Sequence, residues 1–435
     1  MTTSSNFKLK FRKILNDLKR RPEDAAEDLD IPKRIVDKIL NGKHPLSFEI
    51  IKKAVEVWPV NYTDFFSTQD DALKGYKLFK SSQSDKSKRI MYRGGKPYYL
   101  YKDTVMSKIS SFRPEWIQEL VVVDNDNPKN KKVKYNNGHF LHQFTYFIGP
   151  VNFYYIKNNR KVVAKMNTGD SMYISPYISH TFTTRKNKEN RLGHILALTY
   201  ADKVDTESLN ELTAVGYELA KRSRINTKNS ISSFVSNLEK HLKASSLTKK
   251  MLEKEIKINL KKINKIPELK VLQKIANFLT VGVRDLLPPN KDHEVKIQKY
   301  KSNRNWYYPS NNNKFYKIVE LTNLPQLPYS KGIELTILSN KENKVYFEIP
   351  CHQYLYNIGK ESCVIKFENG KSIKFSPGDS AYLKPNIKHK FIKKGKILIL
   401  RIGGKISGDV LYQLSMVNKD DFKRVIEDNN PWFNK

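Results

Sequence analysis

The sequence predicts an α+β protein in which one unit, a helical bundle followed by a β-rich domain, is written twice along 435 residues. Three pairs of similar stretches recur in the same order: 50–66 with 271–287, HQFTYFIG (142–149) with HQYLYNIG (352–359), and GDSMYISPYISHTF (169–182) with GDSAYLKPNIKHKF (378–391). The last pair aligns without gaps and shares Gly, Asp, Ser, Tyr, Pro, Ile, His and Phe. The fold class is therefore a tandem duplication.

The repeat divides the chain into four predicted domains. We expect a helical domain over 1–75, a β-rich domain over 76–205, a second helical domain over 206–292 and a second β-rich domain over 293–435.

The first helical domain has short apolar periodic runs with clear ends. Pro22 and Pro32 stand where a first helical turn tolerates proline, and Gly42 lies in a turn that ends a helix. The domain resembles the helix-turn-helix of phage repressors, and the second helical domain is its parallel.

The β-rich domains alternate large apolar and polar residues between turns that contain Gly and Asn, which indicates an all-β sandwich or barrel. The pattern G-D-x5-P-x3-H, present in both copies, resembles the second signature of cupins. Cupins are double-stranded β-helix (jelly-roll) domains with a metal inside.

A candidate metal site lies in the first β-rich domain. On a strand over 136–147, His139 and Gln143 share one face, whereas His142 points to the other and is assigned to structure. His180 comes from a neighbouring strand. Together His139, Gln143 and His180 predict a facial triad of the kind that holds non-haem Fe(II).

Such triads ordinarily contain a carboxylate, and this one has none. Ile174 stands where an acid could reach the metal, and Asp170 is expected to cap its own turn. Gln143 would supply a neutral oxygen, which leaves the charge of the iron uncompensated and favours an anionic, chelating substrate.

The second copy keeps Gln353 and His389, but Ile349 stands at the position of His139. Two ligands do not make a stable site, so we expect a degenerate, non-metal domain.

Composition limits the alternatives. The net charge of +35 comes mostly from lysines spread along the whole chain, so nucleic-acid binding is not the expected role. The cysteines, Cys351 and Cys363, are expected to be reduced core thiols, and no apolar run is long enough to span a membrane. We expect a cytoplasmic protein.

The whole chain resembles the fused helix-turn-helix/cupin oxygenases that act on 2-hydroxyethylphosphonate. The motifs that carry the resemblance are LKRRPEDAAEDL (18–29), RGGKPYYLY (93–101), NNGHFLHQF (136–144) and GDSMYISPYISH (169–180). In the dioxygenase branch of that family a glutamate falls at Ile174. In the methylphosphonate synthase branch this glutamate is absent and a glutamine takes the place of Gln143, so the chain resembles the synthase branch on both counts.

The resemblance implies further site residues. Arg93, Tyr101 and Asn136 would bind the phosphonate. Lys19, from the first helical domain, would reach the site from the same chain or from the partner subunit of a homo-oligomer. Lys19 and Tyr101 are the candidate catalytic side chains. The serine of the dioxygenase branch is replaced by Ala197.

These observations predict an Fe(II)-dependent enzyme that uses O2 to cleave the C–C bond of 2-hydroxyethylphosphonate and releases methylphosphonate and carbon dioxide, without 2-oxoglutarate. A first alternative releases hydroxymethylphosphonate and formate. A second alternative is a DNA-binding regulator with a ligand-sensing cupin.

Overall fold

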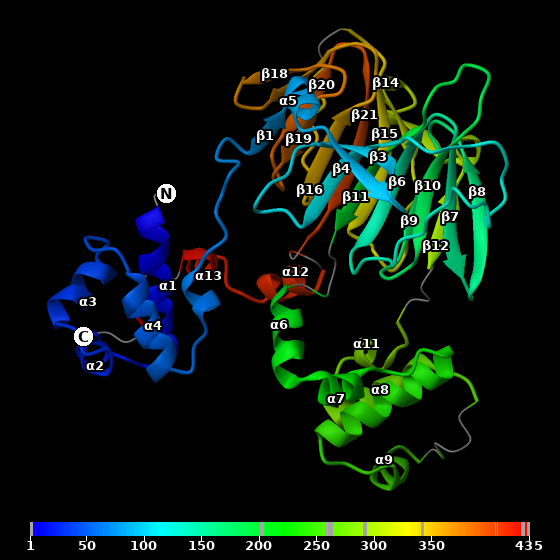
Figure 1. Cartoon of the computed structure of the whole chain (residues 1–435). Coiled ribbons are helices and arrows are strands. Elements are labelled where there is room, and N and C mark those ends of the chain that lie inside the picture. Colours follow the sequence, from blue (N-terminus) through cyan, green and yellow to red (C-terminus); the bar gives the residue numbers. More distant parts are fainter. Residues whose placement is uncertain are drawn as a thin grey trace.

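A computed structural model describes residues 3–200, 204, 206–257, 259, 264–289, 294–340, 343–404, 406, 408–427 and 431–432. Two β-sandwiches lie side by side, with helical segments below and to one side (Figure 1). This arrangement confirms the predicted α+β class. The predicted domain limits at residues 1, 205, 292–293 and 435 lie outside the described residues.

The first β-sandwich contains a seven-stranded and a four-stranded sheet. The larger sheet has the order β12 (Val295–Gln298), β9 (Ser171–Ile174), β6 (His142–Ile148), β11 (His194–Tyr200), β4 (Phe112–Glu119), β3 (Lys96–Asp103), β2 (Arg89–Arg93). The smaller has the order β5 (Val122–Val123), β10 (His180–Arg185), β7 (Val151–Lys157), β8 (Arg160–Met166). Buried side chains of both sheets, such as Phe147 and Phe153, meet in one core.

The second β-sandwich repeats this order strand for strand in its larger sheet. That sheet runs β1 (Tyr76–Phe79), β19 (Ser380–Leu383), β16 (His352–Asn357), β21 (Gly395–Ile402), β15 (Ser330–Ile337), β14 (Asn313–Glu320), β13 (Asn305–Ser310). The smaller sheet runs β18 (Ser372–Phe375), β17 (Cys363–Phe367), β20 (His389–Ile392). The structure thus carries the repeat that the sequence contains.

The two sandwiches exchange one edge strand each, which the sequence did not predict. Strand β1 precedes the first sandwich in the chain but pairs with β19 of the second, and β12 precedes the second but pairs with β9 of the first.

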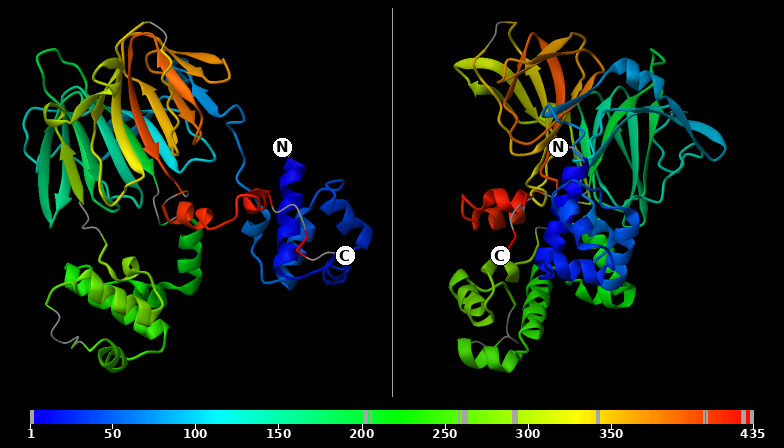
Figure 2. Two further views of the ribbon diagram at one scale, coloured as in Figure 1. Left: turned by 180° about the vertical axis from the view of Figure 1, so that it is seen from behind. Right: turned by 90° about the vertical axis from the view of Figure 1, so that its left-hand side faces the viewer.

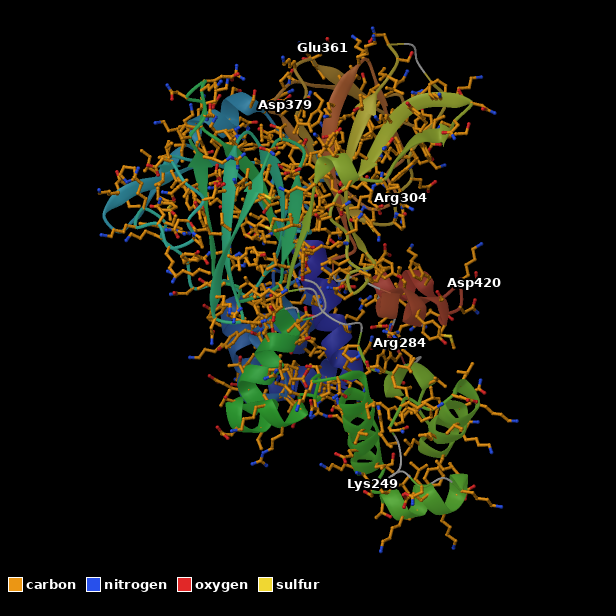
Figure 3. All side chains as sticks on the ribbon, turned by 90° about the vertical axis from the view of Figure 1, so that its right-hand side faces the viewer. Lys249, Arg284, Arg304, Glu361, Asp379 and Asp420 are labelled. Carbon is orange, nitrogen blue, oxygen red and sulfur yellow. The ribbon has the colours of Figure 1, made fainter. Side chains whose placement is uncertain are left out.

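The residues after each exchanged strand bind an aspartate of the other sandwich. Asp379 accepts hydrogen bonds from Lys80 Nζ (3.0 Å) and Ser81 N (2.9 Å). Asp170 accepts them from Lys299 Nζ (2.9 Å) and Tyr300 N (2.9 Å). Asp379 lies where α5 (Ser81–Lys86) meets the strands of the second sandwich (Figure 3).

A shared core lies between the sandwiches. It joins Phe144 and Leu198 of the first to Tyr354 and Leu400 of the second. Within it the Tyr146 hydroxyl donates to the buried carboxylate of Glu334 at 2.6 Å. The two β-domains therefore form one packed body.

The N-terminal helical bundle contains α1 (Thr3–Asp17), α2 (Pro22–Asp28), α3 (Lys33–Leu40), α4 (Phe48–Val57) and the short η1 (Tyr62–Phe65). As expected, Pro22 occupies the first turn of α2, and Gly42 follows α3 with φ +71°. Residues such as Phe11, Val36 and Phe65 fill its core.

The remaining helices lie in the middle and at the end of the chain: α6 (Thr206–Val215), α7 (Tyr217–Ala220), η2 (Lys221–Ser223), α8 (Ser230–Ala244), α9 (Lys249–Ile256), α10 (Leu269–Leu279), α11 (Val283–Leu286), η4 (Tyr300–Ser302), α12 (Gly408–Ser415) and α13 (Phe422–Glu427). One turn of the first bundle recurs in the second helical region. Asp64 accepts a hydrogen bond from Asn61 N in the first, and Asp285 accepts one from Gly282 N in the second. Within the described part of the chain, no helix is long and apolar enough to cross a membrane.

Candidate metal centre

A cavity of about 100 Å³ lies inside the first β-sandwich. Its walls, which we call the site pocket, consist of Arg93, Tyr99, Tyr101, Glu115, Ile117, Asn136, His139, Gln143, His180, Phe182, Ala197 and Thr199. Six of the seven site residues that the sequence suggested line it, and the seventh, Lys19, does not. The volume is that of roughly three water molecules, so the pocket is matched to a small ligand.

His139 reaches the pocket from a loop, and not from a strand as predicted. Strand β6 begins only at His142, because the chain turns at Gly138, where φ is +76°. A Cβ on Gly138 would lie 2.6 Å from the Tyr177 backbone, so the turn requires glycine. The His139 carbonyl accepts the amide hydrogen of Tyr177 at 2.8 Å and fixes the loop. The premise of strand alternation was therefore wrong for His139, although its expected position is correct.

Gln143 is buried on β6, where Ile174 and Thr199 are its neighbours on the flanking strands. Its Nε2 donates to Thr145 Oγ1 at 2.8 Å, which directs Oε1 to the other side. Oε1 lies 3.0 Å from His139 Nε2. The amide is thus held with its oxygen facing the pocket.

His180 is the first residue of β10, and its ring is held by a hydrogen bond at Nδ1, the ring nitrogen nearer the backbone. Its Nδ1 lies 2.7 Å from the Ile178 carbonyl, so Nδ1 carries the proton and Nε2 has a lone pair that faces the pocket. Asn136 Nδ2 lies 3.3 Å from that Nε2. Burial, with smaller contributions from His139 and Arg93, lowers the pKa of His180 to about 3, which keeps the ring neutral.

The donor set fits a metal ion. His139 Nδ1 also faces a carbonyl, that of Leu141 at 2.8 Å, which leaves its Nε2 as a lone pair beside Gln143 Oε1. Two lone-pair atoms 3.0 Å apart repel unless a cation lies between them. Hydrogen bonds at the far atom of each ligand are the usual way in which proteins orient metal ligands.

A conventional site with a carboxylate ligand is not available. Among the described residues, no three His, Cys, Asp or Glu side chains gather as a metal-binding group. Ile174 is fully buried beside Gln143 and offers no donor atom. The ligands His139, Gln143 and His180 therefore form an uncharged set.

A cationic wall lies next to these ligands. The Arg93 guanidinium donates to Lys134 O (2.8 Å) and Thr181 Oγ1 (3.1 Å), and it packs over the rings of Tyr98 and Tyr99. These contacts fix the guanidinium plane, which is the geometry required to bind an oxyanion through two hydrogen bonds.

Tyr101 and Asn136 complete the polar wall. Burial and nearby Glu115 raise the pKa of Tyr101 to about 12, so its phenol stays protonated and can donate a hydrogen bond. Asn136 Oδ1 accepts from His180 N (2.8 Å) and Gly138 N (3.0 Å), which directs its Nδ2 toward the pocket.

Sequence reasoning missed five pocket residues: Tyr99, Glu115, Ile117, Phe182 and Thr199. Glu115 is a carboxylate, bonded to Arg89 at 3.3 Å, and burial raises its pKa. Alternation along one strand could have shown that Glu115 and Ile117 share a face. Nothing in the sequence, however, indicates that this strand lies near His139. Ala197 lines the pocket where the serine was expected.

Lys19 does not line the site pocket within one chain. The N-terminal bundle that carries it stands to one side of both sandwiches in Figure 1 and in the left view of Figure 2. Lys19 has φ +53°, its Nζ donates to Asp17 O at 3.0 Å, and it lies 5.6 Å from the centre of the Trp432 ring.

Two residues have the structural roles that we expected. His142 faces away from the pocket, with Nδ1 2.7 Å from the Tyr173 hydroxyl. Asp170 accepts the Asn167 amide hydrogen at 3.0 Å and so caps its turn, in addition to its contacts with Lys299 and Tyr300.

The fold and the site together define a double β-sandwich protein with a candidate metal centre of His139, Gln143 and His180. No protein-family model matches the sequence. The methylphosphonate synthase of Nitrosopumilus maritimus (strain SCM1) is 43% identical to the chain over 434 residues, which cover 97% of this chain and 94% of that protein. The chain belongs to the methylphosphonate synthase family.

Solved structures agree with this assignment. Streptomyces albus HEPD, with 2-hydroxyethylphosphonate and Fe(II) bound, superposes with a TM-score of 0.92 at 31% identity and covers 99% of both chains. PhpD with cadmium atoms superposes with a TM-score of 0.73 at 17% identity, over 98% of this chain and 99% of that chain, which supports the fold alone.

Proposed function

We propose that the chain is an Fe(II)-dependent oxygenase that converts 2-hydroxyethylphosphonate and O2 into methylphosphonate and carbon dioxide. The observation that carries the proposal is the uncharged ligand set of His139, Gln143 and His180 in a chain 43% identical to a methylphosphonate synthase. Iron, when bound, supplies the activation of O2.

The charge of the site favours the substrate. With three neutral ligands the two positive charges of Fe(II) would remain uncompensated by the ligand set, and Arg93 adds a third beside them. A phosphonate dianion balances this charge. Arg93 would bind it through paired hydrogen bonds, and Asn136 Nδ2 and the Tyr101 phenol would bind its remaining oxygens.

The reaction balances without a co-substrate. One 2-hydroxyethylphosphonate and one O2 give one methylphosphonate, one carbon dioxide and one water. The substrate supplies all four electrons, so 2-oxoglutarate is not required. The pocket's apolar residues, Ile117, Phe182 and Ala197, would keep water from the reacting carbon atoms.

The test is product analysis. The protein is loaded with Fe(II) without oxygen, 2-hydroxyethylphosphonate and O2 are added, and phosphorus NMR follows the products, with metal-free protein as the control. We expect methylphosphonate only in the iron-loaded sample. Absence of turnover by fully loaded protein would overturn the proposal.

A second candidate keeps the site and changes the products to hydroxymethylphosphonate and formate. The 0.92 TM-score to Streptomyces albus HEPD favours it. The same phosphorus spectra distinguish it, because the two phosphonates have different chemical shifts.

We also propose that Lys19 acts in trans within a homo-oligomer, because within one chain it does not line the site pocket and the bundle that carries it stands apart from the sandwiches (Figure 2, left). Mixing Lys19→Ala protein with Gln143→Ala protein tests this. Recovery of activity in mixed oligomers supports donation in trans, and a mixture no more active than its parts contradicts it.

The two helical bundles would then be duplicated helix-turn-helix-like domains without a role in binding nucleic acid. The first of them would serve as the scaffold that presents Lys19. The scarcity of cysteine supports a cytoplasmic location.

A further inference from the structure

The interior of the second β-sandwich repeats the backbone frame of the site pocket, and two of the residues that differ stand at the candidate metal position. In both copies the carbonyl at the first ligand position accepts an amide hydrogen: His139 O from Tyr177 N and Ile349 O from Asn386 N, both at 2.8 Å. His389 repeats His180, with Nδ1 2.7 Å from the Ile387 carbonyl. Ile349 thus replaces one metal ligand.

The second difference is a cation. On the strand beside the glutamine, Gln143 faces Thr199, whereas Gln353 faces Arg401. Arg401 Nε donates to Gln353 Oε1 at 3.4 Å. The guanidinium therefore stands beside the glutamine oxygen, where the first sandwich would hold its metal.

This guanidinium has no acidic partner among the described residues. The groups that act on its charge are the Cys351 thiol and the Tyr308 phenol, and burial lowers the pKa of Arg401 to about 10. The Phe347 ring lies 5.9 Å from the Arg401 guanidinium and 5.9 Å from the His389 ring. A buried cation without a counter-ion is costly to the folded protein.

Three buried nitrogens there have no hydrogen-bond partner: Arg401 Nη2, Gln353 Nε2 and His389 Nε2. Gln353 and His389 are fully buried, so solvent does not satisfy them. Arg401 and Gln353 offer N–H donors, while His389, whose Nδ1 proton is used by Ile387, offers a lone pair. A ligand that satisfied all three nitrogens would accept two hydrogen bonds, donate one and carry negative charge.

We propose that the second β-sandwich binds a small, singly protonated oxyanion, bicarbonate, on Arg401, Gln353 and His389. Its oxygens accept from Arg401 and Gln353, and its hydroxyl donates to His389. Cys351 and Arg401 are partly exposed, which provides a route of entry. The second β-sandwich would thus bind an anion at the position where the first β-sandwich would bind a metal cation.

The test is thermal unfolding of the full-length protein in bicarbonate against chloride, at matched pH and ionic strength. We expect bicarbonate to raise the Tm saturably by about 2 °C, since a ligand that binds only the folded state stabilises it. Arg401→Thr, which restores the residue type of the first sandwich, and Gln353→Ala are each expected to abolish the increase.

Two controls isolate the site. Arg304, exposed on the same sandwich (Figure 3), is replaced by Thr to remove the same charge, and His180→Ala disables the site pocket. Both are expected to keep the increase. No saturable increase in the unmodified protein, or an equal one in Arg401→Thr and Gln353→Ala, would overturn the proposal. Formate, which lacks the hydroxyl, is expected to act more weakly, and an equal effect would contradict the role of His389.

Discussion

The two β-sandwiches share strand order, turns and even individual hydrogen bonds, yet their interiors have opposite chemistry. The amide of Phe182 donates to the Tyr99 hydroxyl in the first, and the amide of Phe391 donates to the Tyr316 hydroxyl in the second. The frame is thus the same. The pairs that differ include His139 with Ile349, Thr199 with Arg401 and Glu115 with Ile333. Substitutions inside a shared frame thus place the partly exposed cation of Arg401 where the first sandwich has its candidate metal site.

The largest expected effect tests this comparison at the histidine that both interiors share, His180 in the first sandwich and His389 in the second. Replacement of His180 by Ala removes a metal ligand, so product formation should fall by roughly 100-fold or more, beyond the loss typical of outer contacts to a metal ligand. The matched change His389→Ala should leave turnover within about 2-fold once folding is verified, because that ring lies in the other sandwich. Equal losses would show that the second copy takes part in catalysis.

Arg93 provides the next largest effect. Arg93→Lys keeps the charge but removes the planar fork, so the KM for 2-hydroxyethylphosphonate should rise about 10-fold or more, equivalent to roughly 1.4 kcal/mol or more. Steady-state kinetics measure it, with the exposed Arg160→Lys on β8 as the control. An unchanged KM would exclude Arg93 from phosphonate binding.

Gly138 tests the turn before His139, which differs between the two sandwiches. Its counterpart in the second sandwich, Glu348, has no positive φ and carries a side chain. Gly138→Ala should lower the free energy of unfolding by roughly 1–3 kcal/mol and weaken iron binding, since the Tyr177 backbone blocks a Cβ. Denaturant unfolding and iron titration measure both. Gly95 has φ +74° but open space around it, so Gly95→Ala is the control for strain without a clash.

The smallest effect concerns a feature in which the copies agree. Asp170→Asn and Asp379→Asn each weaken three matching hydrogen bonds, one of which is also an ion pair with a lysine. Each should cost about 1–3 kcal/mol, and the two losses should be similar. Denaturant unfolding compares them, with the exposed Asp30→Asn as the control. Losses that differ by more than about 2 kcal/mol would show that the two exchanged strands do not contribute equally.

The sequence predicted the parts of this molecule that are repeated or local. The duplication of the β-rich domain, the meeting of His139, Gln143 and His180 in one pocket and the turn of Asp170 follow from short motifs, because a motif fixes its own backbone. Arg401, Glu115 and the exchange of β1 and β12 did not follow, because each depends on which distant strand lies alongside. His139 was placed correctly from a wrong premise, since the Gly138 turn and a strand happen to direct its side chain to the same place.

The exchange of edge strands also determines when, during synthesis, the two β-sandwiches can complete their sheets. Strand β1 is synthesised early, but its partner β19 follows about 300 residues later. At 5–20 residues per second, β1 waits roughly 15–60 s on the ribosome as an unpaired edge. Its residues, Tyr76, Lys77, Leu78 and Phe79, are mostly apolar, so the nascent chain carries an aggregation-prone segment until translation is nearly complete. Slower translation of the second half should therefore lower the yield of folded protein, although every residue of the site pocket has by then been made.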